Sequence, residues 1–380
     1  MKGAFFTLCL LPMLGAAPAT SRAQERSAPP DAAITTSTRR AVLDSLAARI
    51  EGSYVYPDVG DDLVRALRRH AARGDYDRIT GARAFADTLN DHMFAVAHDL
   101  HLRVTYDPGQ QVMTACGGGG AGGPVDLERM RAMARQRNFG FERVQRLAGN
   151  VGYLDLRSFD PPGLGAGDVA AAALGFLGNA DALIIDVRRN GGGTAAMVEL
   201  MVTYLLEPGQ RAHLFDMRTR TPEGVELAQS WTLPYAPGPR FGGKEIFILT
   251  SPFTLSAAES FAYAAQAGDL ATIVGEKTAG AGHHGSGFAE LPGDFKAFVA
   301  TGTVTNPVTK AGWEGVGVKP DVAVPAGEAI RVAHVRALES LLGKAATDED
   351  RTRLRGALQQ AEKTAPDPVE PPQGMRIIMR

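Results

Sequence analysis

The chain has 380 residues, of which 44% are hydrophobic and 22% are charged. This composition is ordinary for a globular protein, and the length favours two domains or one large domain with an appendage. The 40 basic and 42 acidic residues give a formal net charge of −2, so no overall positive field exists to attract nucleic acid or an anionic membrane. We therefore expect neither as a partner.

Residues 1–23 have the pattern of a cleaved signal peptide, with Lys2 before an apolar run over 4–14 and small residues at the expected cleavage site. The run is shorter than the roughly 20 apolar residues that span a bilayer and contains Pro12, which disfavours a membrane anchor. The sequence thus predicts a bacterial protein that is periplasmic or secreted, without a membrane span. After signal cleavage Cys116 is the only cysteine, so no intrachain disulfide can form.

The residues after the signal predict a small helical N-terminal domain over 24–106. Apolar residues recur at helical spacing in three segments, 36–50, 61–73 and 81–97. The alternating stretch 101–106 then predicts a strand. Residues 107–149, which include the glycine run 117–123, are expected to form a connecting segment, because consecutive glycines favour no regular structure.

Residues 150–345 predict an α/β core, since strand and helix patterns alternate along this part of the chain. The strands are expected at 150–156, 182–187, 245–250 and 271–274, and the helices at 167–177, 195–206 and 257–267. A strand, a helix and a second strand in this order predict parallel pairing. Strand-like residues follow at 295–304 and a helix at 328–342, and the charged segment 346–380 predicts a partly disordered tail.

Ser256 is the first candidate for chemistry. It follows a predicted buried strand and opens a predicted helix, so its hydroxyl is expected near unpaired N–H groups, especially that of Ala257, that can stabilise an oxyanion. The alternative is structural, because residues 256–259 read Ser-Ala-Ala-Glu and also match a helix capping box. This segment by itself favours the cap.

The second candidate is the glycine turn 186–193, which stands at the carboxyl end of a predicted buried strand, where α/β sheets place their ligands. Its three glycines let backbone N–H groups approach an anion closely. A phosphate-binding loop is disfavoured, because the chain lacks both the Lys-Ser/Thr ending of a nucleotide-binding loop and the spaced glycines of a dinucleotide fingerprint. Both segments are explained together if the glycine turn supplies a second oxyanion donor opposite Ser256.

Several segments, in this order, resemble the serine peptidases that include the tail-specific (carboxy-terminal processing) proteases, the tricorn core and interphotoreceptor retinoid-binding protein. The segments are 98–103, 151–154, 186–193, 249–251 with 255–259, 274–280 and 313–321. The resemblance implies an α/β fold with a crotonase-like (ClpP-like) core of mixed sheet and helices, and a serine peptidase acting on peptides or proteins. The interval 108–150 is too short for the PDZ domain of the tail-specific branch, which favours the tricorn-like branch.

By position, the resemblance implies that Ser256 is the nucleophile, His101 the general base and Glu314 the acid that orients the histidine. The oxyanion donors would be the N–H groups of Gly192 and Ala257. Tricorn-type members place a relaying serine just before the histidine, and here Leu100 stands there. The contact between His101 and Glu314 is therefore expected to be direct, water-mediated or absent.

An alternative base is Lys277. Tail-specific members use a lysine at a position that is occupied here by Ala281, and Lys277 lies four residues earlier. His101 is preferred, because a histidine titrates near neutral pH whereas a lysine must be desolvated to lose its proton.

No cofactor and no metal ion are expected. His98 and His101 lack a third ligand at a recognisable spacing, and the adjacent His283 and His284 point to opposite faces of an extended chain. The retinoid-binding relatives leave one alternative of a different class, which is a non-catalytic binding protein for a small lipophilic ligand on the same fold.

Overall fold

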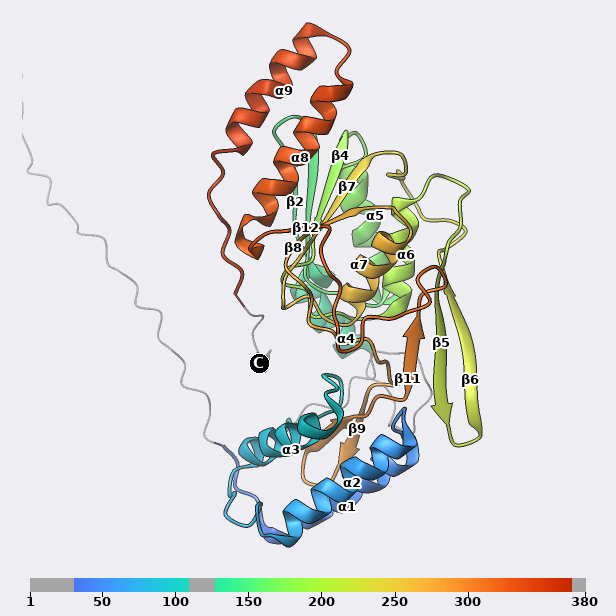
Figure 1. Ribbon diagram of the computed structural model, residues 1–380, viewed down its shortest axis with the longest axis vertical. Coiled ribbons are helices and arrows are strands. Elements are labelled where there is room, and N and C mark those ends of the chain that lie inside the picture. Colours follow the sequence, from blue (N-terminus) through green and yellow to red (C-terminus); the bar gives the residue numbers. More distant parts are fainter. Residues whose placement is uncertain (1–30, 109–126, 371–380) are drawn as a thin grey trace, which may run out of the picture.

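A computed structural model describes residues 31–108 and 127–370 of the chain. An α/β core forms the upper part of the molecule in Figure 1, and a smaller helical part lies below it. The predicted signal peptide 1–23, Cys116 and the glycine run 117–123 lie outside the described residues. Among the helices that the structure describes, none is long and apolar enough to cross a membrane.

The core is built on a six-stranded mixed sheet in the order β12-β8-β7-β4-β3-β2. Its strands are β2 (Phe141–Leu147), β3 (Val151–Leu156), β4 (Ala182–Asp186), β7 (Glu245–Thr250), β8 (Thr272–Gly275) and β12 (Val322–Ala323). Neighbouring strands from β12 to β3 run parallel, and the edge strand β2 pairs antiparallel with β3. The predicted parallel pairing is confirmed by β3 and β4, which are connected through a helix.

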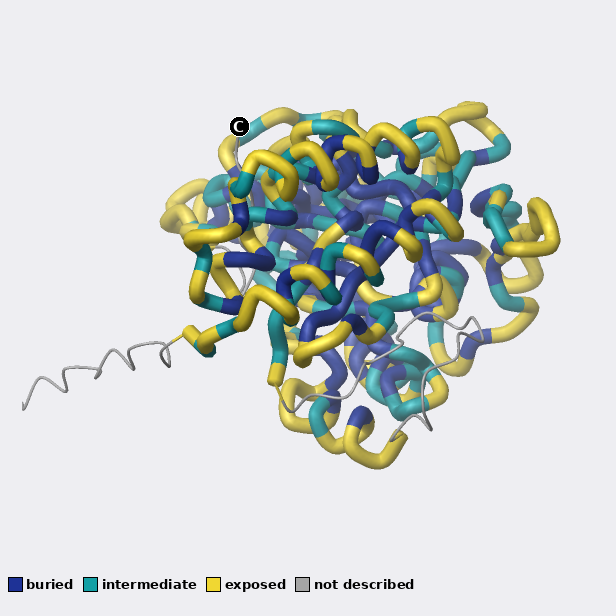
Figure 2. The backbone as a smooth tube through the Cα atoms, turned by 90° about the horizontal axis from the view of Figure 1, so that it is seen from below, coloured by how far each residue is buried: buried dark blue, intermediate teal, exposed yellow. Residues whose placement is uncertain are grey.

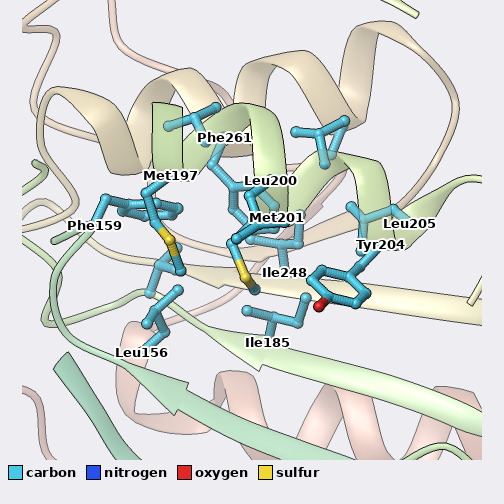
Figure 3. Packing of buried hydrophobic residues seen from close by; sticks show 14 of the residues in the cluster. Leu156, Phe159, Ile185, Met197, Leu200, Met201, Tyr204, Leu205, Ile248 and Phe261 are labelled. Carbon is cyan, nitrogen blue, oxygen red and sulfur yellow. The ribbon is translucent and has the colours of Figure 1, made fainter. Parts of the chain in front are cut away.

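Helices cover both faces of this sheet. The helices are α5 (Ala166–Phe176), α6 (Ala195–Leu205), α7 (Ala257–Ala267), α8 (Ala329–Lys344) and α9 (Asp348–Ala361). Ile185 of β4 packs in the cluster formed with α5, α6 and α7, part of which Figure 3 shows, and its neighbour Ile184 packs in the cluster formed with α8 and α9. The strands are therefore buried on both sides, which explains their nearly continuous apolar sequences. Figure 2 shows the buried chain inside and the exposed chain on the outer surface.

The charged C-terminal segment 346–380, predicted to be partly disordered, contains a helix that the sequence analysis did not predict. Residues Asp348–Ala361 form α9, and Leu354, Ala357 and Ala361 are buried in the same cluster as residues of α8. Beyond the helix, Asp367 accepts hydrogen bonds from Arg188 and Arg189. The charged surface of α9 hides a short apolar stripe, and that stripe is enough to dock the helix.

The three predicted N-terminal helices are present as α1 (Thr36–Ser53), α2 (Pro57–Ala72) and α3 (Ala82–Ala97). This helical part is not built from 24–106 alone. Strand β1 (Arg103–Tyr106) pairs antiparallel with β10 (Phe295–Phe298), which pairs with β9 (Phe288–Leu291). Phe295 is buried in the same apolar cluster as Leu89 of α3. A segment of the predicted core thus completes the N-terminal part.

Two further regions differ from the prediction. The segment 107–149 contains α4 (Leu127–Gln136) and β2, so its described residues form part of the core and do not only connect domains. Strands β5 (His213–Thr221) and β6 (Gly224–Trp231) form an unpredicted hairpin, and β11 (Gly302–Thr305) pairs with β5. This three-stranded sheet extends from the core toward the helical part (Figure 1).

Candidate active site

Ser256 stands at a sharp turn between β7 and α7. Its backbone has φ 57° and ψ −120°, a conformation that residues other than glycine rarely adopt. The turn is tied to the glycine segment, because the N–H of Leu255 donates to the carbonyl of Asn190 at 3.1 Å. Strain of this kind persists only where the surroundings enforce it, and it is common at nucleophilic serines placed between a strand and a helix.

His101 contacts Ser256 although 155 positions separate the two residues. Its Nε2 lies 3.0 Å from the Oγ of Ser256. The ring is held at the junction of α3 and β1, where it packs against Phe298 with the ring centroids 5.5 Å apart. Its Nδ1 is buried and has no hydrogen-bond partner among the described residues. The structure therefore brings together the predicted nucleophile and the predicted base.

The pKa of His101 is lowered to about 4, mainly because burial removes water from the protonated ring. The carboxylate of Asp99 opposes this effect but does not cancel it. At neutral pH the imidazole is therefore uncharged, and its Nε2 can accept the hydroxyl proton of Ser256.

Asp99 organises the surroundings of His101 and was missed by the sequence analysis. Its Oδ1 accepts the main-chain N–H groups of His101 at 2.8 Å and Leu102 at 3.3 Å. Its Oδ2 accepts the hydroxyl of Tyr54 at 3.1 Å and the Nδ1–H of His283 at 2.9 Å. Burial by itself would raise the pKa of Asp99, but the bond from His283 and the nearby histidines hold that pKa below its ordinary value. Asp99 thus supplies a buried negative charge two residues before the base.

Glu314 lies beside this cluster without a direct hydrogen bond to His101. Its Oε2 accepts the N–H groups of Gly282 at 2.5 Å and His283 at 2.7 Å. One ligand atom each from Asp99, His101 and Glu314 lie within 4.8 Å of one another. Burial and the charge of Asp99 raise the pKa of Glu314, while His283 opposes the increase. Of the three expected relations to His101, the direct hydrogen bond is absent from the described residues, and the two side chains are near each other without touching through it.

His283 connects the two acids. Its Nδ1 lies 2.9 Å from Asp99 Oδ2 and 3.7 Å from Glu314 Oε1. Burial would lower the pKa of His283, but the bond to Asp99 and the charge of Glu314 raise it overall. The sequence analysis considered His283 only as part of a metal pair with His284. No local sequence pattern relates His283 to Asp99, because the two residues are 184 positions apart in the chain.

The two predicted oxyanion donors lie beside Ser256. The N–H of Ala257 belongs to the first turn of α7, where N–H groups lack partners within the helix. Gly192 has φ 102°, and a Cβ there would lie 2.8 Å from the Cβ of Ser256 and 3.1 Å from the nitrogen of Ala257. Only glycine fits this close approach. The N–H of Gly192 donates to the Oδ1 of Asn190 at 2.9 Å, so it is already bonded within its own turn.

Glu259, the last residue of the predicted capping box, fixes the backbone around Ser256. It is fully buried and accepts the N–H of Ser256 at 2.9 Å. It also accepts the Thr278 hydroxyl and the N–H groups of Gly280 and Ala281. Burial raises the pKa of Glu259 to about 7, although all of these donors favour the carboxylate. The capping box predicted from sequence is thus present, and the Oγ of Ser256 also reaches His101.

The alternative base Lys277 is exposed on the loop before this region. Ala281, which occupies the family's lysine position, is buried, and its carbonyl accepts the indole N–H of Trp313 at 2.9 Å. Within the described part of the chain, the Oγ of Ser256 is hydrogen-bonded by His101 and not by Lys277.

The group Asp99, His101 and Glu314 has the residue types of a metal site. Both oxygens of Asp99 and one of Glu314 already accept hydrogen bonds from N–H or O–H groups. The Nε2 of His101 faces Ser256. Donors aimed at the carboxylates suit a hydrogen-bonded anionic network better than a cation. The arrangement as a whole fits acyl transfer by an activated serine.

Part of the chain matches a known family, and several solved structures are similar to the chain in fold. Residues 150–324 match peptidase family S41. A putative peptidase from Parabacteroides merdae is similar in structure, with 18% identity, coverage of 82% of this chain and 98% of that chain, and a TM-score of 0.50. A lipoprotein from Streptococcus agalactiae gives 14% identity, 84% and 98% coverage and a TM-score of 0.50. The photosystem II D1 C-terminal processing protease gives 16% identity, 77% and 94% coverage and a TM-score of 0.45.

Proposed function

We propose that this chain, a serine-type peptidase by the match of its residues 150–324 to peptidase family S41, cleaves peptide or protein substrates through an acyl-enzyme on Ser256. His101 is the general base. The observation that carries the proposal is the 3.0 Å contact between the Oγ of Ser256 and the Nε2 of a buried, neutral His101. Two residues 155 positions apart are placed together at a strained turn, which a helix cap alone does not require.

In the proposed reaction His101 Nε2 removes the hydroxyl proton as Ser256 Oγ attacks the carbonyl carbon of the scissile amide. The tetrahedral intermediate collapses, the C–N bond breaks, and the imidazolium gives its proton to the leaving amine. Water, deprotonated by the same imidazole, then attacks the ester and releases the second product with restoration of the serine.

The imidazolium formed in each step needs a stabilising charge. Asp99 and Glu314 supply two carboxylates near the ring, and Asp99 already raises the tendency of His101 to bind a proton. We assign this role to the pair, with Asp99 additionally fixing the main chain of His101. A buried carboxylate that orients and stabilises the base is the usual third member of such a site.

For the oxyanion, the N–H of Ala257 is the first donor. The second is assigned to Gly192, whose N–H points at Asn190 Oδ1 in the resting arrangement. The substrate oxygen must therefore share or replace that acceptor. Donors of this kind, held in place before the reaction, each contribute about 3 kcal/mol to transition-state stabilisation.

The test is labelling with a serine-directed fluorophosphonate. Wild-type protein is expected to react at Ser256, while Ser256→Ala and His101→Ala lose the reaction and Lys277→Ala retains it. Absence of labelling in folded wild-type protein would favour the non-catalytic binding protein. Full labelling of His101→Ala together with loss in Lys277→Ala would transfer the base role to the lysine.

Export is a separate part of the proposal and rests on the pattern of residues 1–23. Expression of the full chain in a Gram-negative host, followed by fractionation and N-terminal sequencing, is expected to give a periplasmic or secreted protein that begins near residue 24. A cytoplasmic protein with an intact N-terminus would contradict it.

A further inference from the structure

We propose that a cavity next to the catalytic cluster is a substrate subsite for a carboxylate, which Arg218 binds. The cavity has a volume of about 470 Å³ and lies between residues 55–57, at the junction of α1 and α2, and residues 218–225 of the β5–β6 hairpin. Thr303 of β11 also lines it. This inference deepens the proposed function and rests on it, because the ligand is part of the peptide substrate.

The cavity adjoins the catalytic cluster through Tyr56. The ring of Tyr56 lines the cavity and packs edge-on against the ring of His283, with the centroids 5.5 Å apart. His283 in turn bonds Asp99, which holds the main chain of His101. A group bound in the cavity therefore lies against Tyr56, which connects it through His283 and Asp99 to the residues around the base.

The strand that carries Arg218 is hydrogen-bonded to the loop that contains His283 and His284. The ring of His284, the residue after His283, hydrogen-bonds the main chain of Arg218. The main chain of His284 also pairs with Gly302 of β11, the strand next to β5. These bonds therefore hold the main chain of Arg218 in a fixed position relative to this loop.

Positive charge dominates this cavity. Arg218 and Arg220 are two residues apart on β5, so their side chains lie on the same face of the strand. Arg220 donates to the main-chain carbonyls of Tyr54 and Glu51, which leave its charge uncompensated. Arg218 is exposed and forms no side-chain hydrogen bond or ion pair with any described residue. Glu223 is the one carboxylate among the lining residues, and it makes no ion pair with either arginine in the described chain.

A planar guanidinium without a protein partner matches a carboxylate, which it can bind through two parallel hydrogen bonds. The remaining walls include Val55, Pro57, Pro222 and Val225, which suit the aliphatic part of a residue that carries the carboxylate. Two substrate groups have this chemistry, namely the side chain of an acidic residue and the α-carboxylate at the end of a peptide. The structure thus assigns the subsite to a carboxylate, and peptides can separate its two sources.

The test compares three peptides of the same length that differ only in whether they carry a carboxylate and where it stands. One has an internal glutamate and an amidated end, one has glutamine at that position and a free terminal carboxylate, and one has glutamine and an amidated end. Wild-type protein is expected to cleave at least one of the first two with a kcat/KM about tenfold or more above that of the third. Arg218→Gln is expected to lose this preference, by about tenfold to a hundredfold for a charge-assisted pair. Arg218→Glu is expected to reverse it in favour of a peptide with lysine at the same position.

Arg211→Gln is the matched control. Arg211 lies just before β5 and stacks on Trp231, outside the cavity lining, so this variant is expected to keep the wild-type preference. Binding of the three peptides to Ser256→Ala, measured by fluorescence anisotropy with and without Arg218→Gln, reports the subsite without the chemistry.

The two proposals fail in different ways. Loss of fluorophosphonate labelling and of all cleavage, with a preserved Arg218-dependent binding preference, would refute the peptidase mechanism and keep the carboxylate subsite. Cleavage of all three peptides at equal rates, or a preference that survives in both Arg218 variants, would refute the subsite alone.

Discussion

Lowering the pH from 7.5 to 5.5 is expected to leave the reactivity of Ser256 almost unchanged. Only a neutral His101 can take the hydroxyl proton, and burial lowers the pKa of His101 to about 4. With that value, about 97% of the imidazole is neutral at pH 5.5, so the labelling rate stays close to its value at pH 7.5. With the ordinary value of about 6.5, only about 9% is neutral at pH 5.5, and the rate falls about tenfold.

The same burial makes the folded state sensitive to acid. The pKa of His101 in the folded protein, about 4, lies below the unfolded value of 6.5. The contribution of His101 to stability is therefore fully present above pH 6.5 and is lost as the pH falls toward 4. The difference between the two values corresponds to about 3 kcal/mol, at about 1.4 kcal/mol for each pH unit. Urea unfolding is expected to show a larger loss of stability between pH 7.5 and pH 4.5 in the wild type than in His101→Gln.

The assay is the second-order rate of fluorophosphonate labelling at pH 5.5, 6.5, 7.5 and 9.0, with circular dichroism to confirm that the protein stays folded. Lys277→Ala serves as the control and is expected to give the same profile, because its side chain is exposed and remote from the Ser256 hydrogen bond. A tenfold fall at pH 5.5 in folded protein would refute the reasoning from burial. A rate that climbs steadily to pH 9 would point to a lysine base.

Three further substitutions test the surroundings of the site. Gly192→Ala is expected to reduce the labelling rate at least about a hundredfold and to lower the unfolding free energy by about 1–3 kcal/mol, because φ is 102° and the new Cβ would overlap Ser256. The control is Gly175→Ala, which has open space around it and is expected to keep the wild-type labelling rate and stability. Glu259→Ala removes the acceptor of the N–H groups of Ser256 and Gly280 and is expected to lower the unfolding free energy by about 2–3 kcal/mol and to abolish labelling, so wild-type behaviour would contradict its positioning role. Leu354→Ala is expected to lower the unfolding free energy by about 2–4 kcal/mol with normal labelling, and an unchanged midpoint would mean that α9 does not dock as described.

Elements whose signal lies within their own residues were predictable. The helix over 257–267 is found with the predicted bounds, because its apolar period and its capping residues are local. Strand β2 was missed because an edge strand shows little apolar character, and six of its seven residues are exposed or only partly buried. The β5–β6 hairpin was missed for the same reason, since most of β6 is exposed.

The residues of the site also differ in whether the sequence could predict them. Ser256 and His101 stand in segments whose order along the chain resembles a known family, so their partnership was predictable before their distance was known. The bonds of Asp99 to Tyr54 and His283 join residues that no local pattern relates. Asp99 lies inside the segment 98–103 that carries the resemblance, but the sequence analysis assigned it no role. Its importance appears only when α1, α3 and the loop near 283 are packed together.

The distribution of these residues has a consequence for what the fold does. Ser256 and its glycine neighbours are held by the core, whereas His101 is held at the junction of α3 and β1. That junction is stabilised by β10, a strand that leaves the core and pairs with β1. Without the docked helical part, Ser256 would keep its helix N-terminus and its glycine turn but would have no base. The proposed peptidase chemistry therefore depends on the junction that delivers His101 to Ser256.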